Sequence, residues 1–230
     1  MKYSVLFFLS LFFNTAIDAQ ELSGAWMRKL DTAVQYLTIV DRYMVITTFD
    51  LEEKKFFQTR GGAAQIDAKK ISGVIEFNTT NKDEVKLPYS YDYVINNKKL
   101  MFAIDGNSNE WTRIDDGKTG LAGNWRITGR MQDGKLVAMN PGARKTIKVL
   151  SGTRFQWTAI NTETGEFFGT GGGRYTFESG KYTEHIEFFS RDATRVGSSL
   201  SFNAEIKDGN WHHSGSSSKG DAIYEIWSRK

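Results

Sequence analysis

The chain has 230 residues, no cysteine and a formal net charge of +3. The absence of cysteine excludes disulfides and a lipid anchor on an N-terminal Cys. Basic residues form no run longer than two, which excludes the clustered patch that nucleic-acid binding requires.

The first 19 residues have the layout of a secretory signal peptide. Lys2 precedes the apolar run Val5–Phe13, and small residues follow as far as Ala19. The run is much shorter than the roughly 20 residues needed to cross a bilayer, and no later segment is long and apolar enough to do so. We therefore expect cleavage after Ala19, no membrane span afterwards, and export to the periplasm or the medium. An exported protein without disulfides is more typical of bacteria.

The rest of the chain contains two copies of the same opening sequence group. Leu22-Ser-Gly-Ala-Trp26 returns as Leu121-Ala-Gly-Asn-Trp125, and each half closes on a related group, Glu110-Trp-Thr-Arg113 and Glu225-Ile-Trp-Ser-Arg229. Such self-similarity indicates an internal repeat. We predict a first unit over residues 20–114, a linker over 115–120 and a second unit over 121–230.

The middle of each half aligns without gaps. Phe56–Gly62 lies over Phe167–Gly173, and the same offset carries Ile75-Glu-Phe77 onto Ile186-Glu-Phe188. Residues in Lys181–Phe189 alternate with the period of a strand. Their counterparts in the first unit are apolar or small on one face only, so that face should point inward. The residues expected to point inward are Ile71, Gly73, Ile75 and Phe77 in the first unit, and Tyr182, Glu184, Ile186 and Phe188 in the second. The same alignment of the two units also predicts that Phe155, Trp157, Tyr175 and Phe177 point inward.

Turn signals such as Ser179-Gly180 and Asp208-Gly209 recur at short intervals, and no helix long enough for a crossover lies between them. The 22 Gly and the high Phe, Tyr and Trp content also suit short strands. We predict an all-β fold of two tandem antiparallel barrels with about eight strands each. Residues Gly129 to Arg144 read as a loop covering one end of the second barrel.

The repeated groups give the chain a resemblance to lipocalins and other calycins. In that family a Gly-x-Trp on the first strand closes one end of the barrel and an Arg on the last strand packs over its ring. The resemblance implies that Trp26 pairs with Arg113 and Trp125 with Arg229, as structural closures.

The second unit also resembles the lipocalin-like secreted proteins of Bacteroidetes-type bacteria, more than the first unit does, through Gly173-Arg-Tyr175, Tyr182-Thr-Glu184 and its closing group. The first unit departs from that pattern, with Ala64 and Gly73 at the positions of Tyr175 and Glu184.

Glu184 is the most informative candidate, because a carboxylate on an inward face is costly unless it is paired or solvated. Two interpretations are open. Either an internal Arg or Tyr pairs with it, or Glu184 lines a wet cavity with Trp157, Tyr175 and Tyr182 and anchors a ligand.

No cofactor, metal site or catalytic residue is predicted. His212 and His213 are adjacent on a strand and therefore point to opposite faces. Glu184 and Glu225 could act as a paired acid and base only if the closing strand turns Glu225 inward. We expect a non-enzymatic module that binds a small apolar or aromatic ligand in the second barrel. The alternative is a structural module with filled barrels and a protein partner.

Overall fold

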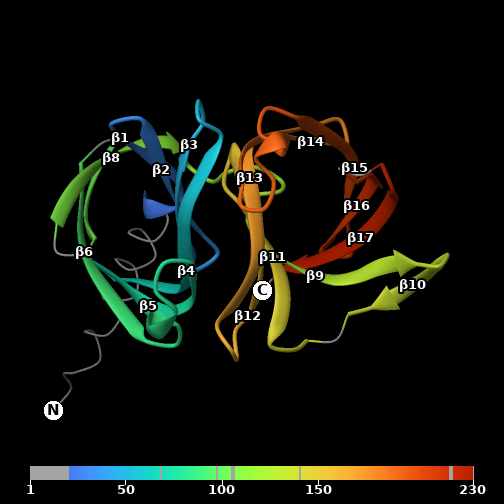
Figure 1. Ribbon diagram of the computed structural model, residues 1–230, viewed down its shortest axis with the longest axis horizontal. Helices are drawn as coiled ribbons and strands as arrows, with labels where there is room; N and C mark the ends of the chain where they lie inside the picture. The colour runs from blue at the N-terminus through green and yellow to red at the C-terminus, as the bar shows by residue number, and fades with distance from the viewer. Residues whose placement is uncertain are drawn as a thin grey trace, which may run out of the picture.

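The structure is a computed structural model that describes residues 21–67, 69–96, 98–104, 107–139, 141–217 and 220–229. Two antiparallel β-barrels stand side by side (Figure 1). In the first, each strand pairs with the next along the chain, and β1 closes the ring on β8. Its strands are β1 (Gly24–Leu30), β2 (Ala33–Val40), β3 (Tyr43–Asp50), β4 (Lys55–Asp67), β5 (Lys70–Asn78), β6 (Pro88–Asn96), β7 (Lys99–Ile104) and β8 (Asn107–Asp115).

The second barrel is also a closed ring of eight strands, in which β9 pairs with β11 on one side and β17 on the other. Its strands are β9 (Gly123–Gln132), β11 (Arg144–Leu150), β12 (Arg154–Asn161), β13 (Glu166–Glu178), β14 (Lys181–Phe189), β15 (Ser199–Lys207), β16 (Asn210–Ser216) and β17 (Ala222–Arg229). A single 3-10 turn follows the fifth strand of each ring, η1 (Lys82–Glu84) and η2 (Ala193–Arg195). The predicted fold class is confirmed.

One further strand, β10 (Lys135–Ala138), pairs only with the far end of β9, and the resulting hairpin projects from the barrel (Figure 1). The prediction of a loop from Gly129 to Arg144 is therefore wrong for the part in β9 and β10. The turn Asp133-Gly134 has φ of 49° and 72°, the geometry that two-residue hairpin loops favour. An Asp-Gly pair is a sequence signal for this hairpin.

A β-bulge interrupts the alternation in the same place in each barrel. Glu187 has no partner in the register between β13 and β14, and Glu76 has none between β4 and β5. The extra residue reverses the faces that follow it. Phe77 and Phe188, which were predicted to point inward, therefore lie outside their own barrels: Phe77 belongs to the core between the barrels, and the ring of Phe188 packs 4.9 Å from that of Phe49 in the first barrel.

The space between the barrels holds a core of its own. Its fully buried apolar residues come from the outer faces of both barrels: Val40, Tyr43, Val45 and Phe77 from the first, and Ile147, Val149 and Ile160 from the second. Buried polar groups cross it as well. Thr47 Oγ1 donates to Gln156 Oε1 at 2.6 Å, and Gln156 Nε2 donates to Thr59 Oγ1 at 3.0 Å.

Both bulge carboxylates also reach across this interface. Glu76 lies 2.6 Å from Lys145 Nζ, and Glu187 accepts a hydrogen bond of 3.1 Å from the hydroxyl of Tyr36. The two barrels are therefore joined by packing and by specific polar contacts, rather than only by the segment between β8 and β9.

The predicted signal peptide, residues 1–19, lies outside the described residues. Within the ranges that the structure describes, no helix is long and apolar enough to cross a membrane.

Candidate functional site

The repeated Leu-x-Gly-x-Trp group closes one end of the first barrel. Trp26 is fully buried, and its Nε1 donates to the carbonyl oxygen of Leu22 at 3.0 Å. The guanidinium carbon of Arg113 lies 4.1 Å from the ring centre, and Arg113 Nη1 donates to the carbonyl oxygen of Ser23 at 3.0 Å. The Arg thus covers the ring and hydrogen-bonds the residue just before the strand that carries it.

The second barrel repeats this geometry. Trp125 Nε1 donates to the carbonyl oxygen of Leu121 at 2.9 Å, Arg229 lies 4.7 Å over the ring, and Arg229 Nη2 donates to Ala122 at 2.8 Å. In both barrels, steric constraints explain why the third residue of the repeated group is glycine. Gly24 has φ of +117°, and a Cβ added to it would lie 2.1 Å from the carbonyl oxygen of Asp115.

Above this closed end, the second barrel buries an ion pair. Lys148 on β11 and Glu184 on β14 approach to 2.7 Å, and both side chains are 6% exposed. The ammonium group lies 5.2–5.9 Å from the centres of four aromatic rings: Tyr182, Phe202, Trp211 and Trp227. The interior thus stabilises a positive charge through one carboxylate and several ring faces.

A second pair lies on the neighbouring strands β16 and β17. His213 Nδ1 is 3.3 Å from Glu225 Oε2, which also accepts a hydrogen bond of 3.1 Å from Trp227 Nε1. Burial and then the positive charge of Lys148 lower the pKa of His213, so its imidazole is uncharged at neutral pH. Burial would raise the pKa of Glu225, but the hydrogen bond from His213 and the charge of Lys148 outweigh it and leave that pKa below its ordinary value.

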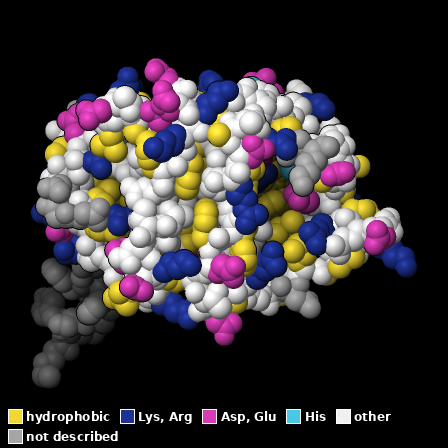
Figure 2. All heavy atoms as spheres, viewed as in Figure 1, with side chains coloured by type: hydrophobic (Ala, Val, Ile, Leu, Met, Phe, Trp, Pro, Cys, Tyr) yellow, Lys and Arg dark blue, Asp and Glu magenta, His cyan; other side chains and the backbone are white. Residues whose placement is uncertain are grey.

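We call Lys148, Glu184, His213 and Glu225 the polar quartet. They meet a cavity of about 260 Å³ in the second barrel, whose walls are mainly aromatic and aliphatic: Trp157, Phe189, Leu200, Phe202, Ile223 and Trp227. Figure 2 shows the hollow in this barrel, with hydrophobic and acidic side chains around it. Neither Trp125 nor Arg229 lines it. The cavity therefore lies away from the closed end.

The structure brings only part of the predicted ligand site to this cavity. Trp157 and Glu184 line it, and Trp157 packs against Phe189 with ring centres 5.4 Å apart. Tyr182 points inward but lies beneath the cavity, against Lys148. Burial and then the charge of Glu184 raise the pKa of Tyr182 well above its ordinary value, so its hydroxyl stays protonated.

Tyr175 is buried but does not line the cavity. Its hydroxyl donates to the carbonyl oxygen of Ser151 at 2.6 Å and lies 2.8 Å from Thr119 Oγ1. Tyr175 therefore links the segment between the barrels to the second barrel by hydrogen bonds. An inward-pointing side chain is thus not necessarily a ligand contact.

The ion-pair partner of Glu184 is Lys148, where we expected an arginine or a tyrosine, and Tyr182 also interacts with this carboxylate. His212 and His213 do point to opposite faces: His213 faces the cavity, and the ring of His212 is hydrogen-bonded to Tyr224. Glu225 is turned inward, yet it and Glu184 are each held by a basic partner. This pairing counts against the acid and base pair considered from the sequence.

Among its described residues, the first barrel has no equivalent of the polar quartet. Matching the barrels strand by strand from their closing Trp residues places Leu37 at Lys148, Gly73 at Glu184, Phe102 at His213 and Asn109 at Glu225. Leu37 and Phe102 belong to a large buried apolar cluster with Trp26 and Trp111. A separate cavity of about 320 Å³ in this barrel is mostly polar, with Arg28, Gln35, Thr48, Arg60, Asn78 and Glu84 on its walls. Several of these side chains hydrogen-bond one another.

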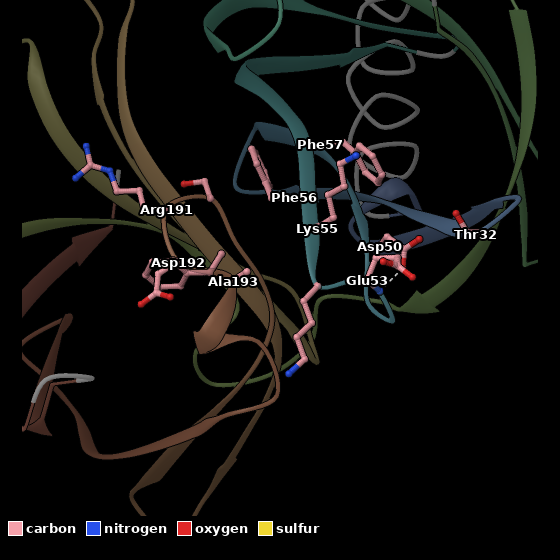
Figure 3. Close-up of a pocket in the computed structure, with 12 residues that line it drawn as sticks. Thr32, Asp50, Glu53, Lys55, Phe56, Phe57, Arg191, Asp192 and Ala193 are labelled. Carbon is pink, nitrogen blue, oxygen red and sulfur yellow. Dashed lines mark hydrogen bonds between the residues drawn. The ribbon is translucent and has the colours of Figure 1, made fainter.

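A larger groove of about 570 Å³ runs between the barrels. Figure 3 shows Phe56 and Phe57 on the side of the first barrel and Arg191 and Asp192 on the side of the second. Its buried carboxylate, Asp50, accepts hydrogen bonds from the backbone of its own turn, at Glu52 and Glu53. Among the described residues that line the groove, no set of buried polar groups converges on it, so the cavity of the second barrel is the better candidate.

Closed eight-stranded antiparallel barrels, each shut at one end by a Trp beneath an Arg, form a lipocalin-like fold. A similar solved structure is that of a lipocalin-like protein from Bacteroides uniformis, with 11% identity, a TM-score of 0.35, and coverage of 48% of this chain and 98% of that one. Another is that of an uncharacterized protein from Bacteroides eggerthii, with 12% identity, a TM-score of 0.34, and coverage of 47% and 98%. No family model and no curated protein matches the chain.

Proposed function

We propose that the protein is an exported binding module whose second barrel holds a small, partly apolar molecule. The observation that carries this proposal is the cavity over the polar quartet. Apolar walls that surround a few convergent polar groups are the usual design of a small-molecule site. The cavity of about 260 Å³ suits a compact ligand rather than a long lipid.

The first barrel has a structural role in this proposal. Apolar residues replace Lys148 and His213 there and belong to the buried cluster that packs on its closing Trp26, and the cavity that remains in this barrel is mostly polar. Its outer face supplies half of the core between the barrels. The unit over residues 20–114 would thus hold the unit over 121–230 in place through more than the linker 115–120. The proposal also includes cleavage of residues 1–19 when the protein is exported.

Titration with indole, followed by amide chemical shifts, tests the proposal. Indole is compact, flat and apolar, with one hydrogen-bond donor. We expect saturable shifts at Glu184, Leu200 and Ile223, and none at Leu37 or Phe102, which lie in the buried apolar cluster of the first barrel.

Two matched variants sharpen this test. Ile223→Trp places a large ring at the cavity wall and should abolish the shifts, whereas Val94→Trp, at a site on the first barrel that is 63% exposed, should leave them unchanged. Shifts confined to the groove around Phe57, or the same binding by both variants, would refute a site in the second barrel.

A further inference from the structure

Glu225 lines the cavity, and the hydrogen bonds that hold its carboxylate reach only one of the two oxygens. The contacts from His213 and Trp227 both reach Oε2, and among the described residues nothing donates to Oε1. The side chain of Glu225 is 24% exposed, while that of its partner His213 is 2% exposed. Glu225 is thus a cavity-lining carboxylate that two hydrogen bonds hold through Oε2 and that keeps acceptor capacity on Oε1.

This carboxylate is the uncompensated charge of the site. Lys148 is matched by Glu184 at 2.7 Å, and His213 is uncharged at neutral pH. The polar quartet therefore carries one net negative charge. Arg195, at the rim of the cavity, does not offset it, because its guanidinium is already 3.1 Å from Asp192.

The cavity walls also favour a positive group. Phe202 and Trp227, two of the rings that surround the ammonium of Lys148, line the cavity as well, and Trp157 and Phe189 add two more ring systems. Ring faces attract cations and more so where water is excluded. An anionic ligand would instead meet the ionised carboxylate of Glu225.

We infer that the ligand of the second barrel is a small cationic amine with an aromatic or aliphatic body, whose ammonium group pairs with Glu225 Oε1. This inference rests on the proposed function and names its ligand class. The amine donates to the free oxygen, the apolar body lies against Trp157 and Phe189, and Lys148 and Glu184 form the neutral floor.

Three indoles with similar bodies and different charge test this: tryptamine, 3-methylindole and indole-3-propionate, titrated by calorimetry at neutral pH. Tryptamine should bind at least about tenfold more tightly than indole-3-propionate, since a hydrogen bond to a charged group contributes about that factor. 3-Methylindole should lie between them.

Glu225→Gln keeps the shape of the side chain and an acceptor for Trp227. It should weaken tryptamine binding about tenfold, while 3-methylindole binding changes less than about twofold and so shows that the cavity is intact. Glu205→Gln removes the same charge from an exposed position on β15 and should change neither.

Equal or tighter binding of indole-3-propionate, or undiminished tryptamine binding by Glu225→Gln, would overturn the cationic ligand while leaving a binding cavity in place. If none of the three indoles binds, the proposed function fails with it.

Discussion

At the scale of single residues, Lys148 decides the chemistry of the second barrel. It compensates Glu184, lowers the pKa of His213 and helps to keep that of Glu225 low. A buried ion pair adds little net stability compared with apolar residues of the same shape, but breaking it leaves an uncompensated charge. The pair is therefore better explained by the site it builds than by the stability it contributes.

Lys148→Met should lower the free energy of unfolding by about 3 kcal/mol or more, because Glu184 is left buried without a partner. Adding Glu184→Gln should restore most of the loss. Urea unfolding of both variants measures this, with Lys181→Met at the exposed start of β14 as the control. Additive losses in the double variant would show that the two side chains do not act as a pair.

At the scale of elements, the β-bulges explain why β4 and β13 carry glycine where they pair with the bulged strands. A Cβ on Gly173 would lie 2.1 Å from the carbonyl oxygen of His185, and one on Gly62 would lie 2.0 Å from that of Val74. Close approach of the backbones at these points displaces Glu187 and Glu76 from the register. As a result, each of these carboxylates lies at the interface between the barrels, and the phenylalanine that follows it points out of its own barrel.

Gly173→Ala should therefore destabilise the protein by about 2 kcal/mol or more, because its φ of +153° is also unfavourable for alanine. Gly142→Ala, where nothing lies within 4 Å of the added Cβ, is the matched control and should change stability by less than about 1 kcal/mol. Thermal melts followed by circular dichroism compare the two. Similar melting temperatures would contradict a steric requirement at the bulge.

At the scale of the whole molecule, the two barrels share a core and should unfold together. Asp41 of the first barrel accepts from the backbone of Asn124 at 3.0 Å and lies 3.3 Å from Arg229 at the closed end of the second. Asp115, at the end of the first barrel, accepts from Gly152 and Thr153 in the turn between β11 and β12. These contacts fix the orientation of one barrel on the other.

Scanning calorimetry of the wild type should show one cooperative transition. Ile147→Asp places a charge in the core between the barrels and should cost at least about 3 kcal/mol and separate the transitions. Val137→Asp, on the projecting hairpin, should change stability by less than about 0.5 kcal/mol. Two transitions in the wild type would mean that the barrels are energetically independent.

Much of the fold could be predicted because its signals are local. The alternation in β14 placed Glu184 inward, Ser179-Gly180 has the positive φ values of a tight hairpin, and each Trp lies beneath its predicted Arg. Only half of the candidate site was predicted correctly from the sequence. Trp157 and Glu184 line the cavity, whereas Tyr182 and Tyr175 do not. Whether an inward residue meets a ligand depends on its height in the barrel, and alternation carries no information about height.

The sequence by itself determined two closed β-barrels, their closed ends and one buried carboxylate, since a two-residue period and a repeated motif act within a strand or between its ends. Only the tertiary structure decided the remaining chemistry. Alternation alone would turn the apolar Ile147 and Val149 of β11 into the barrel and Lys148 out to solvent. Because the outer face of β11 packs on the first barrel, Ile147 and Val149 are buried there, and Lys148 points inward to Glu184.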